Sequence, residues 1–408
     1  MVNSIQLKMV HTLFHSTNSV FIPYLPLLLL QRGFSTTETS TLLMLGPFIA
    51  MFAQPVAGMI SDRIGAVRPL LLSLWVLMGI CGTTLFLTTD SYITIASLLI
   101  MYIFFMPTVS LLDALTVKMA PLLGTSYSSI RLWGSVGFCL MLVGMGMFFD
   151  QIGGVSALLW VFLSIWSGVM IMFLIMREPE ATTSERDKVE EASKPRTLNW
   201  KSARQVFANP TLLVFFGMLM LIAIPHRMND GLLSIHLQAE GGTGNHISWA
   251  WAVAGASEII GFFFMGNIVK RFSMQRMLLI VSILYTIRWG LCVWFTDPWA
   301  IVAIQAMHAI TFVAVWVTSI EFVARILPRE MNATGQALLN MLFIGVAGIA
   351  GGSIGGALHE SYGGAGMYSF GIVSAALAAI GFMIWSNQSK ARKQKYNKVS
   401  HKQVSSSL

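Results

Sequence analysis

Charged residues are scarce in this sequence. Asp, Glu, Lys and Arg make up 11% of the 408 residues, whereas about a quarter of a soluble domain is charged. Hydrophobic residues make up 55%, and the mean hydropathy is +0.70. Such a chain lacks the polar surface that a water-soluble domain needs, so the composition predicts an integral membrane protein.

Cysteines are few, and motifs that carry catalysis are missing. Cys81, Cys139 and Cys292 each lie in an apolar run, so we expect packing residues and no disulfide framework. The sequence has no metal-binding cluster, nucleophile elbow or phosphate-binding loop. We therefore expect neither an enzyme nor a bound cofactor.

Long apolar runs are what the sequence has instead. Twelve runs are long enough to cross a membrane as a helix, with ends that we expect to hold within about four residues. They cover residues 8–31, 38–60, 67–88, 92–118, 127–149, 154–176, 209–238, 247–269, 275–296, 299–325, 333–358 and 364–386.

One hydrophilic segment divides the twelve runs into two sets of six. Residues 177–204 carry thirteen charges and no long apolar run. We therefore predict an all-α membrane protein whose spans form two sets of six. The first set lies in residues 1–176 and the second in residues 207–386, with a linker at residues 177–206 and a basic tail at residues 387–408.

The basic residues lie mostly on one side of the membrane. We call the side reached by loops after odd-numbered spans the odd side, and the other the even side. Arg32 is the one Lys or Arg in an odd-side loop, whereas 21 of the 26 fall at the N-terminus, in even-side loops or in the tail. Short cytoplasmic loops are enriched in Lys and Arg, so both termini and the linker are predicted to be cytoplasmic. The net charge of +8 then reflects topology and contact with membrane lipids, not nucleic-acid binding.

Two even-side loops repeat one motif. GMISDRIGAVRPL begins at Gly58 and GNIVKRFSMQRML begins 208 residues later, each between the second and third span of its half. We expect the glycine to permit close helix packing and the arginines to hold the loop against neighbouring helix ends. The motif residues are Gly58, Asp62, Arg63, Gly65 and Arg68, and Gly266, Arg271 and Arg276, with Lys270 in place of the aspartate.

The first copy resembles the G-x-x-x-D-R-x-G-x-x-R loop signature of the major facilitator superfamily. With twelve spans and a central linker, the resemblance extends over nearly the whole chain. It implies that the two sets of spans are pseudo-symmetric six-helix bundles around a central cavity that opens alternately to the two sides. The motif residues themselves imply gating and stability, and they carry no information on the substrate.

Ionisable residues inside the membrane are costly unless they are paired or wetted. The predicted spans contain Asp113, Arg131, Arg227, Asp230, Glu258, Arg288, His308 and Glu321. Asp113 and Arg131 are each nine residues from the centre of their turn at position 122. We predict that they meet roughly 8 Å inside the even side, at about 1.5 Å per residue. The alternative to a functional pair is a static ion pair that locks two helices.

Three ionisable residues of the second half share a greater depth. Glu258 and Arg288 are each fifteen residues from position 273, and Arg288 and His308 are each ten residues from Pro298. The count places all three roughly 17 Å deep, near the midplane. A histidine beside a carboxylate and an arginine is a candidate for proton handling, and the alternative is again a structural lock.

The remaining charges have local explanations. Arg227 and Asp230 are spaced as a pair within one helix, and Pro225 beside them allows a broken helix that faces the cavity. Glu321, near the even end of its span, is expected to be structural.

Small residues form a ridge in span eleven. Gly348, Gly352 and Gly356 recur every four residues, which suits close contacts between helices that move.

Within the superfamily, the chain is similar to the proton-coupled sugar symporters of the lactose permease type. It is more similar to the branch with 3-phenylpropionate permease-like and nucleoside symporter-like proteins. The stretches that carry the resemblance are FIPYLPLLL, YSSIRLWGSVGF, SEIIGFFFMGNIVKRF, IRWG and QAMHAITF. In the lactose permease, a glutamate and an arginine eighteen residues later grip the sugar, and Asp113 and Arg131 keep that spacing. Phe138 takes the position of the permease's stacking tryptophan.

The proton-coupling positions agree only in part. Arg288 and His308 fall on the permease's arginine and histidine, but its proton-carrying glutamate corresponds to Thr311. A second glutamate position is Gly255, with Glu258 one turn further on. The resemblance therefore implies proton coupling through a different carrier, for which Glu258 is the first candidate and Asp113 the second.

The hypothesis is a monomeric transporter of the bacterial inner membrane that moves a sugar, a nucleoside or an aromatic acid together with protons. The proton gradient would replace any cofactor, and Arg288 would help Glu258 to release its proton. The predicted substrate-binding residues are Asp113, Arg131, Phe138, Asn18, Trp133 and His226, and the predicted proton-coupling residues are Glu258, Arg288 and His308. The main alternative is a proton-antiport exporter of amphipathic compounds. A membrane sensor is disfavoured because no loop is long enough to form a signalling domain.

Overall fold

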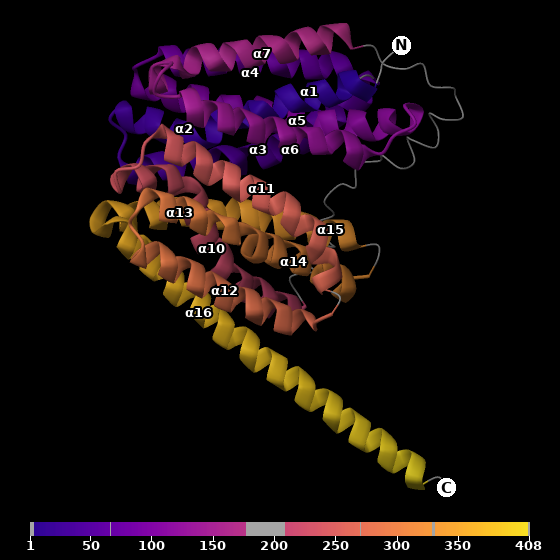
Figure 1. Ribbon diagram of the computed structural model, residues 1–408. Coiled ribbons are helices and arrows are strands. Elements are labelled where there is room, and N and C mark those ends of the chain that lie inside the picture. The colour runs from indigo at the N-terminus through magenta and orange to yellow at the C-terminus, as the bar shows by residue number, and fades with distance from the viewer. Residues whose placement is uncertain (1–3, 66, 177–208, 270, 329–330, 407–408) are drawn as a thin grey trace.

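The computed structural model describes residues 4–65, 67–176, 209–269, 271–328 and 331–406, and every regular element in these ranges is a helix (Figure 1). The predicted linker and Lys270 lie outside the described residues. The N-terminal half holds α1 (Ser4–Ser16), α2 (Asn18–Gln31), α3 (Thr36–Ile64), α4 (Val67–Leu87), α5 (Ser91–Leu122), α6 (Tyr127–Phe148) and α7 (Leu158–Ile175). The C-terminal half holds α10 (Pro210–Ala239), α11 (Gly244–Val269), α12 (Met274–Trp294), α13 (Pro298–Ile304), α14 (Ala314–Ile326), α15 (Asn332–Asn340) and α16 (Ala347–Ser406).

The first ten predicted spans are confirmed, with each end within four residues of its predicted position. Span one consists of α1 and α2, and span ten consists of α13 and α14 joined by a 3₁₀ turn (Gln305–Met307) and a π-helical turn (Ala309–Val313). The break that Pro225 allows in span seven does not form, because α10 continues as one helix through this residue. A proline removes one backbone hydrogen bond, whereas the membrane favours helical backbone on both sides of it.

Spans eleven and twelve are joined in α16, which reverses direction at Gly363. This residue has φ 66° and ψ −169°, a backbone conformation that is not helical. A Cβ on Gly351 would lie 2.7 Å from the carbonyl of Ile224, while the hydroxyl of Ser374 donates to the carbonyl of Leu221 at 2.7 Å. In a straight helix, residues 351 and 374 would be about 35 Å apart, yet they reach neighbouring positions on α10. The twelve-span prediction is therefore confirmed, and the tail continues the last helix to Ser406 (Figure 1).

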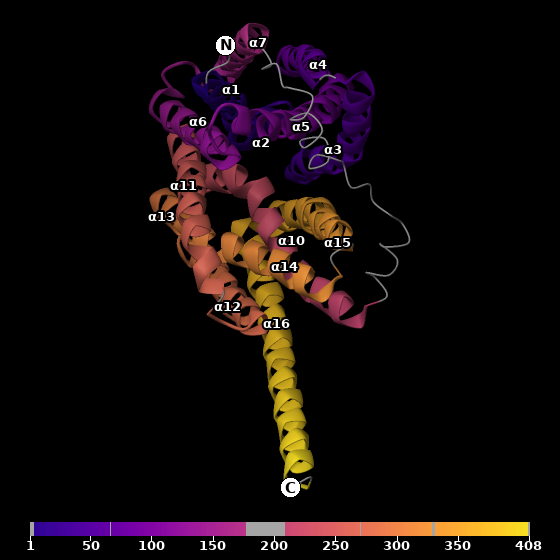
Figure 2. The same cartoon turned by 90° about the vertical axis from the view of Figure 1, so that its right-hand side faces the viewer.

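Each half has its own core of buried side chains. In the N-terminal half, the indole N–H of Trp75 donates to the carbonyl of Trp166 at 3.2 Å, and that of Trp166 donates back at 2.8 Å. In the C-terminal half, Trp289 of α12 stacks on Tyr368 of α16 with ring centroids 5.6 Å apart. Figure 2, viewed from the even side, shows the halves as two separate groups of helices.

The two halves meet toward the odd side. The hydroxyl of Ser40 on α3 donates to the carbonyl of Gly352 on α16 at 2.7 Å. One turn nearer the odd side, the carboxylate of Glu360 accepts from the hydroxyl and the backbone N–H of Thr37 at 2.6 and 3.2 Å. The ridge of small residues in span eleven therefore packs against the other half, and the structure is closed on the odd side.

Candidate functional site

A cavity of about 350 Å³ lies between the two halves. Its N-terminal wall is mainly apolar, and its C-terminal wall carries the charges. The N-terminal wall includes Asn18, Phe21, Met44, Tyr102, Phe105, Met106 and Phe138. The C-terminal wall includes His226, Arg227, Asp230, Trp251, Gly255, Glu258, His308 and Phe312. The volume lies in the range of about 300–1,000 Å³ that is usual for small-molecule sites.

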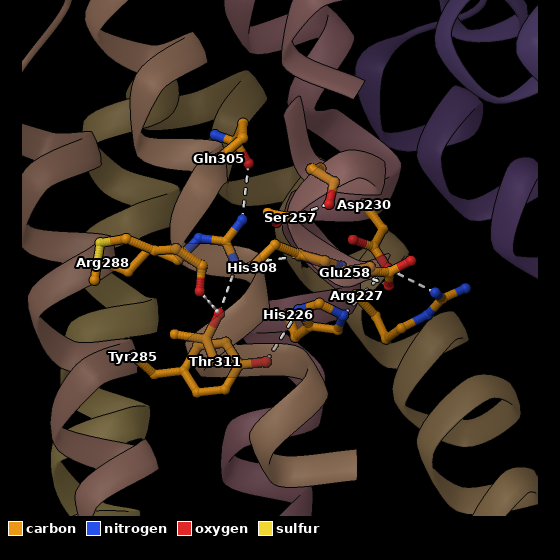
Figure 3. Close-up of polar contacts among 12 residues, drawn as sticks. His226, Arg227, Asp230, Ser257, Glu258, Tyr285, Arg288, Gln305, His308 and Thr311 are labelled. Atoms are coloured by element: carbon orange, nitrogen blue, oxygen red, sulfur yellow. Dashed lines mark hydrogen bonds and ion pairs between the residues drawn. The ribbon is translucent and has the colours of Figure 1, made fainter. Parts of the chain in front are cut away.

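Three spans of the C-terminal half bring one chain of contacts to this wall (Figure 3). Nε2 of His308 lies 3.0 Å from Oε1 of Glu258, and Nη1 of Arg288 lies 3.4 Å from Nδ1 of His308. The predicted common depth of the three residues is confirmed. Their order is new, because His308 lies between the other two and Arg288 reaches Glu258 only through it.

This order fixes the proton positions on the histidine. The guanidinium of Arg288 can only donate, so Nδ1 of His308 accepts. Nε2 then carries the ring proton and donates to the carboxylate of Glu258. In this arrangement the ring of His308 carries one proton, on Nε2. The side chain of Glu258 is 33% exposed.

Arg288 is fully buried and is held by neutral acceptors. Nη2 donates to Oε1 of Gln305 at 2.8 Å, and Nη1 donates to the hydroxyl of Thr311 at 3.0 Å (Figure 3). None of the ion pairs among the described residues includes Arg288. Removing one member of such a buried network leaves the others without partners, so we expect it to be sensitive to substitution.

A second cluster comes from α10. Nη1 of Arg227 lies 2.7 Å from Oδ2 of Asp230, which confirms the local pair predicted from the spacing. Nε2 of His226 lies 3.5 Å from the same oxygen, and Nδ1 of His226 lies 3.2 Å from the hydroxyl of Tyr285. Nη2 of Arg227 also reaches the sulfur of Met44, in the other half, at 3.6 Å. This cluster therefore stands at the seam where the two halves close the cavity.

The predicted pair in the N-terminal half is confirmed but lies at the mouth of the cavity. Nε of Arg131 is 3.4 Å from Oδ1 of Asp113. Each of the two residues lies seven positions from a cavity-lining residue on its own helix, Met106 on α5 and Phe138 on α6. Seven residues are two turns, so the pair shares a helix face with the lining and lies about 10 Å nearer the even side.

The match to known proteins covers most of the chain. Residues 4–370 match the MFS_1-like family. The chain belongs to this family. The superfamily resemblance of its loop motif is thereby confirmed, and the protein is a multi-pass membrane transporter and not an enzyme.

Individual relatives of this MFS_1-like transporter are named for different solutes, in the case of YegT as putative. The maltose permease of Geobacillus stearothermophilus is 22% identical over 320 residues, which are 78% of each chain. YegT of Escherichia coli (strain K12), which bears the name of a nucleoside transporter, is 25% identical over 403 residues, or 90% of each chain. The crystal structure of the nucleoside transporter NupG has a TM-score of 0.81 at 16% identity and covers 94% of this chain and 99% of NupG. This likeness shows the shared fold.

The loop motif of the MFS_1-like chain makes only some of the contacts predicted for it. Arg68 donates from Nε to the carbonyl of Phe173 at 3.1 Å and from Nη2 to that of Leu174 at 2.8 Å, so it caps the end of α7 as expected. The close packing expected at Gly58 and Gly266 is absent, because a Cβ at either would meet nothing within 4 Å. Both glycines lie on the even side, away from the seam that closes the odd side.

The predicted substrate residues fall into three groups. Asn18, Phe138 and His226 line the cavity, whereas Asp113 and Arg131 stand at its mouth. The third group is Trp133, which is absent from the lining and 41% exposed. Two residues advance a helix by about 200°, so Trp133 points away from the face of Arg131. The binding roles stay predictions.

Sequence reasoning missed part of the lining. Arg227 and Asp230 were recognised as a local pair in a segment facing the cavity but were given no role there, and Tyr102 and Trp251 were not singled out. Aromatic residues are common in membrane helices, so only the packing of the two halves distinguishes these rings. Glu321 pairs with Arg325 at 3.0 Å outside the cavity, as expected for a structural residue.

Proposed function

We propose that this transporter takes up a small solute with a flat ring and several hydroxyls, of which a nucleoside is the best example, together with protons. The observation that carries the proposal is the contrast between the two cavity walls. The part-exposed ring of Phe138 offers a face for stacking. Asp230 and Glu258 offer carboxylate oxygens that accept from hydroxyls. A solute that joins a ring to a sugar uses both walls at once.

Neither alternative substrate class uses the cavity as fully. A plain sugar would leave most of the aromatic wall with only weak contacts. An aromatic acid would bring its carboxylate toward Asp230 and Glu258, which repel it unless they are protonated, and the guanidinium of Arg227 is already paired with Asp230. Relatives are named for maltose, for a nucleoside and, as probable, for 3-phenylpropionic acid, so the order nucleoside, sugar, aromatic acid rests on the two cavity walls.

The proton would bind to Glu258. This residue is partly exposed in the cavity, and His308 contacts only one of its oxygens. A proton on Glu258 removes the acceptor charge that His308 meets, which loosens this contact and favours the state opened to the other side. When the cavity faces the cytoplasm, the chain from Arg288 through His308 favours the ionised carboxylate again, and the proton leaves.

The orientation follows from the basic residues. If the even side is cytoplasmic, as the Lys and Arg distribution predicts, the structure is closed to the outside and accessible from within. A membrane potential of 100 mV supplies about 2.3 kcal/mol per proton, enough for roughly 50-fold accumulation. The bacterial inner membrane provides such a potential.

The substrate proposal is tested by binding to the purified protein. Thermal-shift measurements would compare uridine and adenosine with maltose and 3-phenylpropionate, each at several concentrations. We expect the nucleosides to raise the unfolding midpoint and the other two to have smaller effects, because a ligand that binds the folded state stabilises it. If maltose or the acid stabilises the protein more than both nucleosides, the substrate class is wrong.

Export of amphipathic compounds is the second candidate. The aromatic wall favours it, whereas the charged wall favours a polar solute. Membrane vesicles of known orientation separate the two, because a proton gradient of the same sign drives the solute in opposite directions for symport and antiport.

A further inference from the structure

Two buried histidines stand behind the mouth of the cavity and have no part in the function proposed above. His11 and His15 lie one turn apart on α1, are 0% and 6% exposed, and stack with ring centroids 5.8 Å apart. Nε2 of His15 and Nδ1 of His11 are buried and have no hydrogen-bond partner. Buried nitrogens are seldom left unpaired in native structures, so each unpaired nitrogen needs an explanation.

His11 is anchored by its other nitrogen. Its Nε2 lies 2.7 Å from the hydroxyl of Thr116, and that hydroxyl donates to the carbonyl of Leu112 at 2.7 Å. The hydroxyl oxygen therefore accepts from Nε2–H. A proton on the buried Nδ1 would have no acceptor, so the ring of His11 is neutral. His15 has no comparable anchor on its Nε2.

Arg131 is held only loosely by Asp113. The ion pair joins Nε to Oδ1 at 3.4 Å, longer than a good N–H···O hydrogen bond and without the two parallel bonds that arginine and carboxylate can form. The hydroxyl of Tyr127 interacts with both side chains. Nη1 of Arg131 points to a niche over Gly134. A Cβ on Gly134 would collide with Cδ2 of His15 and come within 2.8 Å of Nη1 of Arg131. Cδ2 is bonded to Nε2, so the unpaired imidazole nitrogen and Nη1 of the guanidinium border the same niche.

The imidazole is fixed while the guanidinium can move. The hydroxyl of Ser16 donates to the carbonyl of Gly137 at 3.0 Å, and a Cβ on Gly137 would collide with the backbone of Thr12. α1 and α6 are thus packed backbone against backbone beside His15. Arg131 has four rotatable bonds and stands at the mouth, where its side chain is 32% exposed.

We propose that His15 is the second acceptor for Arg131. The guanidinium pairs with Asp113 while that carboxylate is ionised and free. When Asp113 is protonated or engaged by a solute, Arg131 donates from Nη1 to Nε2 of His15. A positive charge inside the membrane is costly without a partner, so the imidazole lets Arg131 leave the carboxylate without being stranded. His15 acts as a positioning residue for Arg131.

The other groups around this switch are few. His15 faces the charge of Arg131 and the ring of His11, and Asp113 faces Arg131 and the hydroxyl of Tyr127. A proton on His15 would remove its lone pair and repel the guanidinium, so the switch requires the neutral ring. The neutral ring of His11 favours that state because it adds no positive charge beside His15.

A double-mutant cycle on the purified protein tests the proposal without solute or proton gradient, so its outcome does not depend on the transport proposal. Asp113→Asn imitates the protonated carboxylate, and His15→Leu removes the second acceptor. We expect each single variant to lower the unfolding midpoint modestly. The double variant should lower it by about 2–4 °C more than the two singles together, because only then does Arg131 lose both acceptors. Additive effects would overturn the proposal.

Two further variants separate an acceptor from a packing residue. His15→Gln supplies a carbonyl acceptor of similar size, so it should remove most of the extra loss in the Asp113→Asn background. His11→Leu should be additive with Asp113→Asn, because its bonded partner is Thr116. Three outcomes would show that His15 is not an acceptor for Arg131. His15→Gln could behave like His15→Leu, or His11→Leu could couple to Asp113→Asn as strongly as His15→Leu does. The third is that the Asp113→Asn/His15→Gln protein fails to fold.

Discussion

The two walls of the cavity differ in how their polar groups are held. On the N-terminal side, the hydroxyls of Ser16 and Ser19 donate to the carbonyls of Gly137 and Phe138 at 3.0 and 2.9 Å. These bonds fix helix against helix and present the ring of Phe138 to the cavity. On the C-terminal side, the polar contacts join ionisable side chains to one another, as between Glu258 and His308.

This difference indicates a division of labour. A wall whose polar groups bond to the backbone can orient a solute, but the wall itself cannot gain or lose charge during transport. A wall of linked ionisable groups can change its charge by one proton with little movement of the helices. The N-terminal half has its own charged pair, but Asp113 and Arg131 stand outside the enclosed space, where a solute passes them on entry or exit.

The largest effect is expected from Glu258→Gln. The amide cannot take up the proton, so coupling should be lost while the shape of the cavity is kept. Uptake into energised vesicles should fall from roughly 50-fold accumulation to equilibration, whereas exchange of labelled for unlabelled solute should continue. The matched control is Glu321→Gln, because Glu321 pairs with Arg325 outside the cavity. Uphill uptake that survives in Glu258→Gln would move the proton to another group.

A smaller effect is expected from Phe138→Ala, which removes a ring from the opposite wall. Base–aromatic stacking contributes about 1–3 kcal/mol, so the half-saturation concentration for a nucleoside should rise by roughly 5- to 150-fold. Proton coupling should remain, because the C-terminal wall is untouched. Phe148→Ala removes a ring from the same helix that is 52% exposed, and it should have little effect. If Phe138→Ala loses proton coupling and keeps its affinity for the nucleoside, the N-terminal wall takes part in coupling and not in binding, contrary to the division proposed.

The sequence predicts the fold better than the lining of the site. Hydropathy and charge locate the spans because each must be apolar over the thickness of the membrane. Equal distances from a turn place Asp113 opposite Arg131 and bring Glu258, Arg288 and His308 to one depth. Counting residues from a turn gives the depth of a side chain in the membrane, and it does not give the direction in which the side chain points.

Rotation about each helix axis and the seam between the halves come from packing. This is why the count could not show that His308 separates Arg288 from Glu258, or that Trp133 faces outward. For the same reason the sequence does not indicate a role for His15, because that role depends on the niche over Gly134 on a distant span.

The seam between the walls is itself open to test through the ridge on α16. A Cβ on Gly352 would lie 2.6 Å from the carbonyl of Ser40, so Gly352→Leu should prevent close approach of the halves. Overpacking of this kind costs about 1–3 kcal/mol, so the population open on the odd side should rise about tenfold. An impermeant maleimide added on that side would report it through a cysteine at Asn18 in a cysteine-free chain. Gly290→Leu, where a Cβ meets nothing within 4 Å, is the control.

The smallest effect is expected at the odd-side end of the same seam. The carboxylate of Glu360 accepts two hydrogen bonds from Thr37, in the first turn of α3, where a negative charge also meets the positive end of the helix dipole. Glu360→Gln keeps the shape but loses the charge, so labelling at Asn18 should rise by a factor of about two to five. Glu38 bonds the same helix end from within the N-terminal half, through the backbone N–H of Ser35 at 2.8 Å. Glu38→Gln should therefore weaken α3 locally without changing the labelling, because only a contact between the halves can bias which side is open. Equal labelling in the two variants would mean that the charge stabilises the helix and not the closed seam.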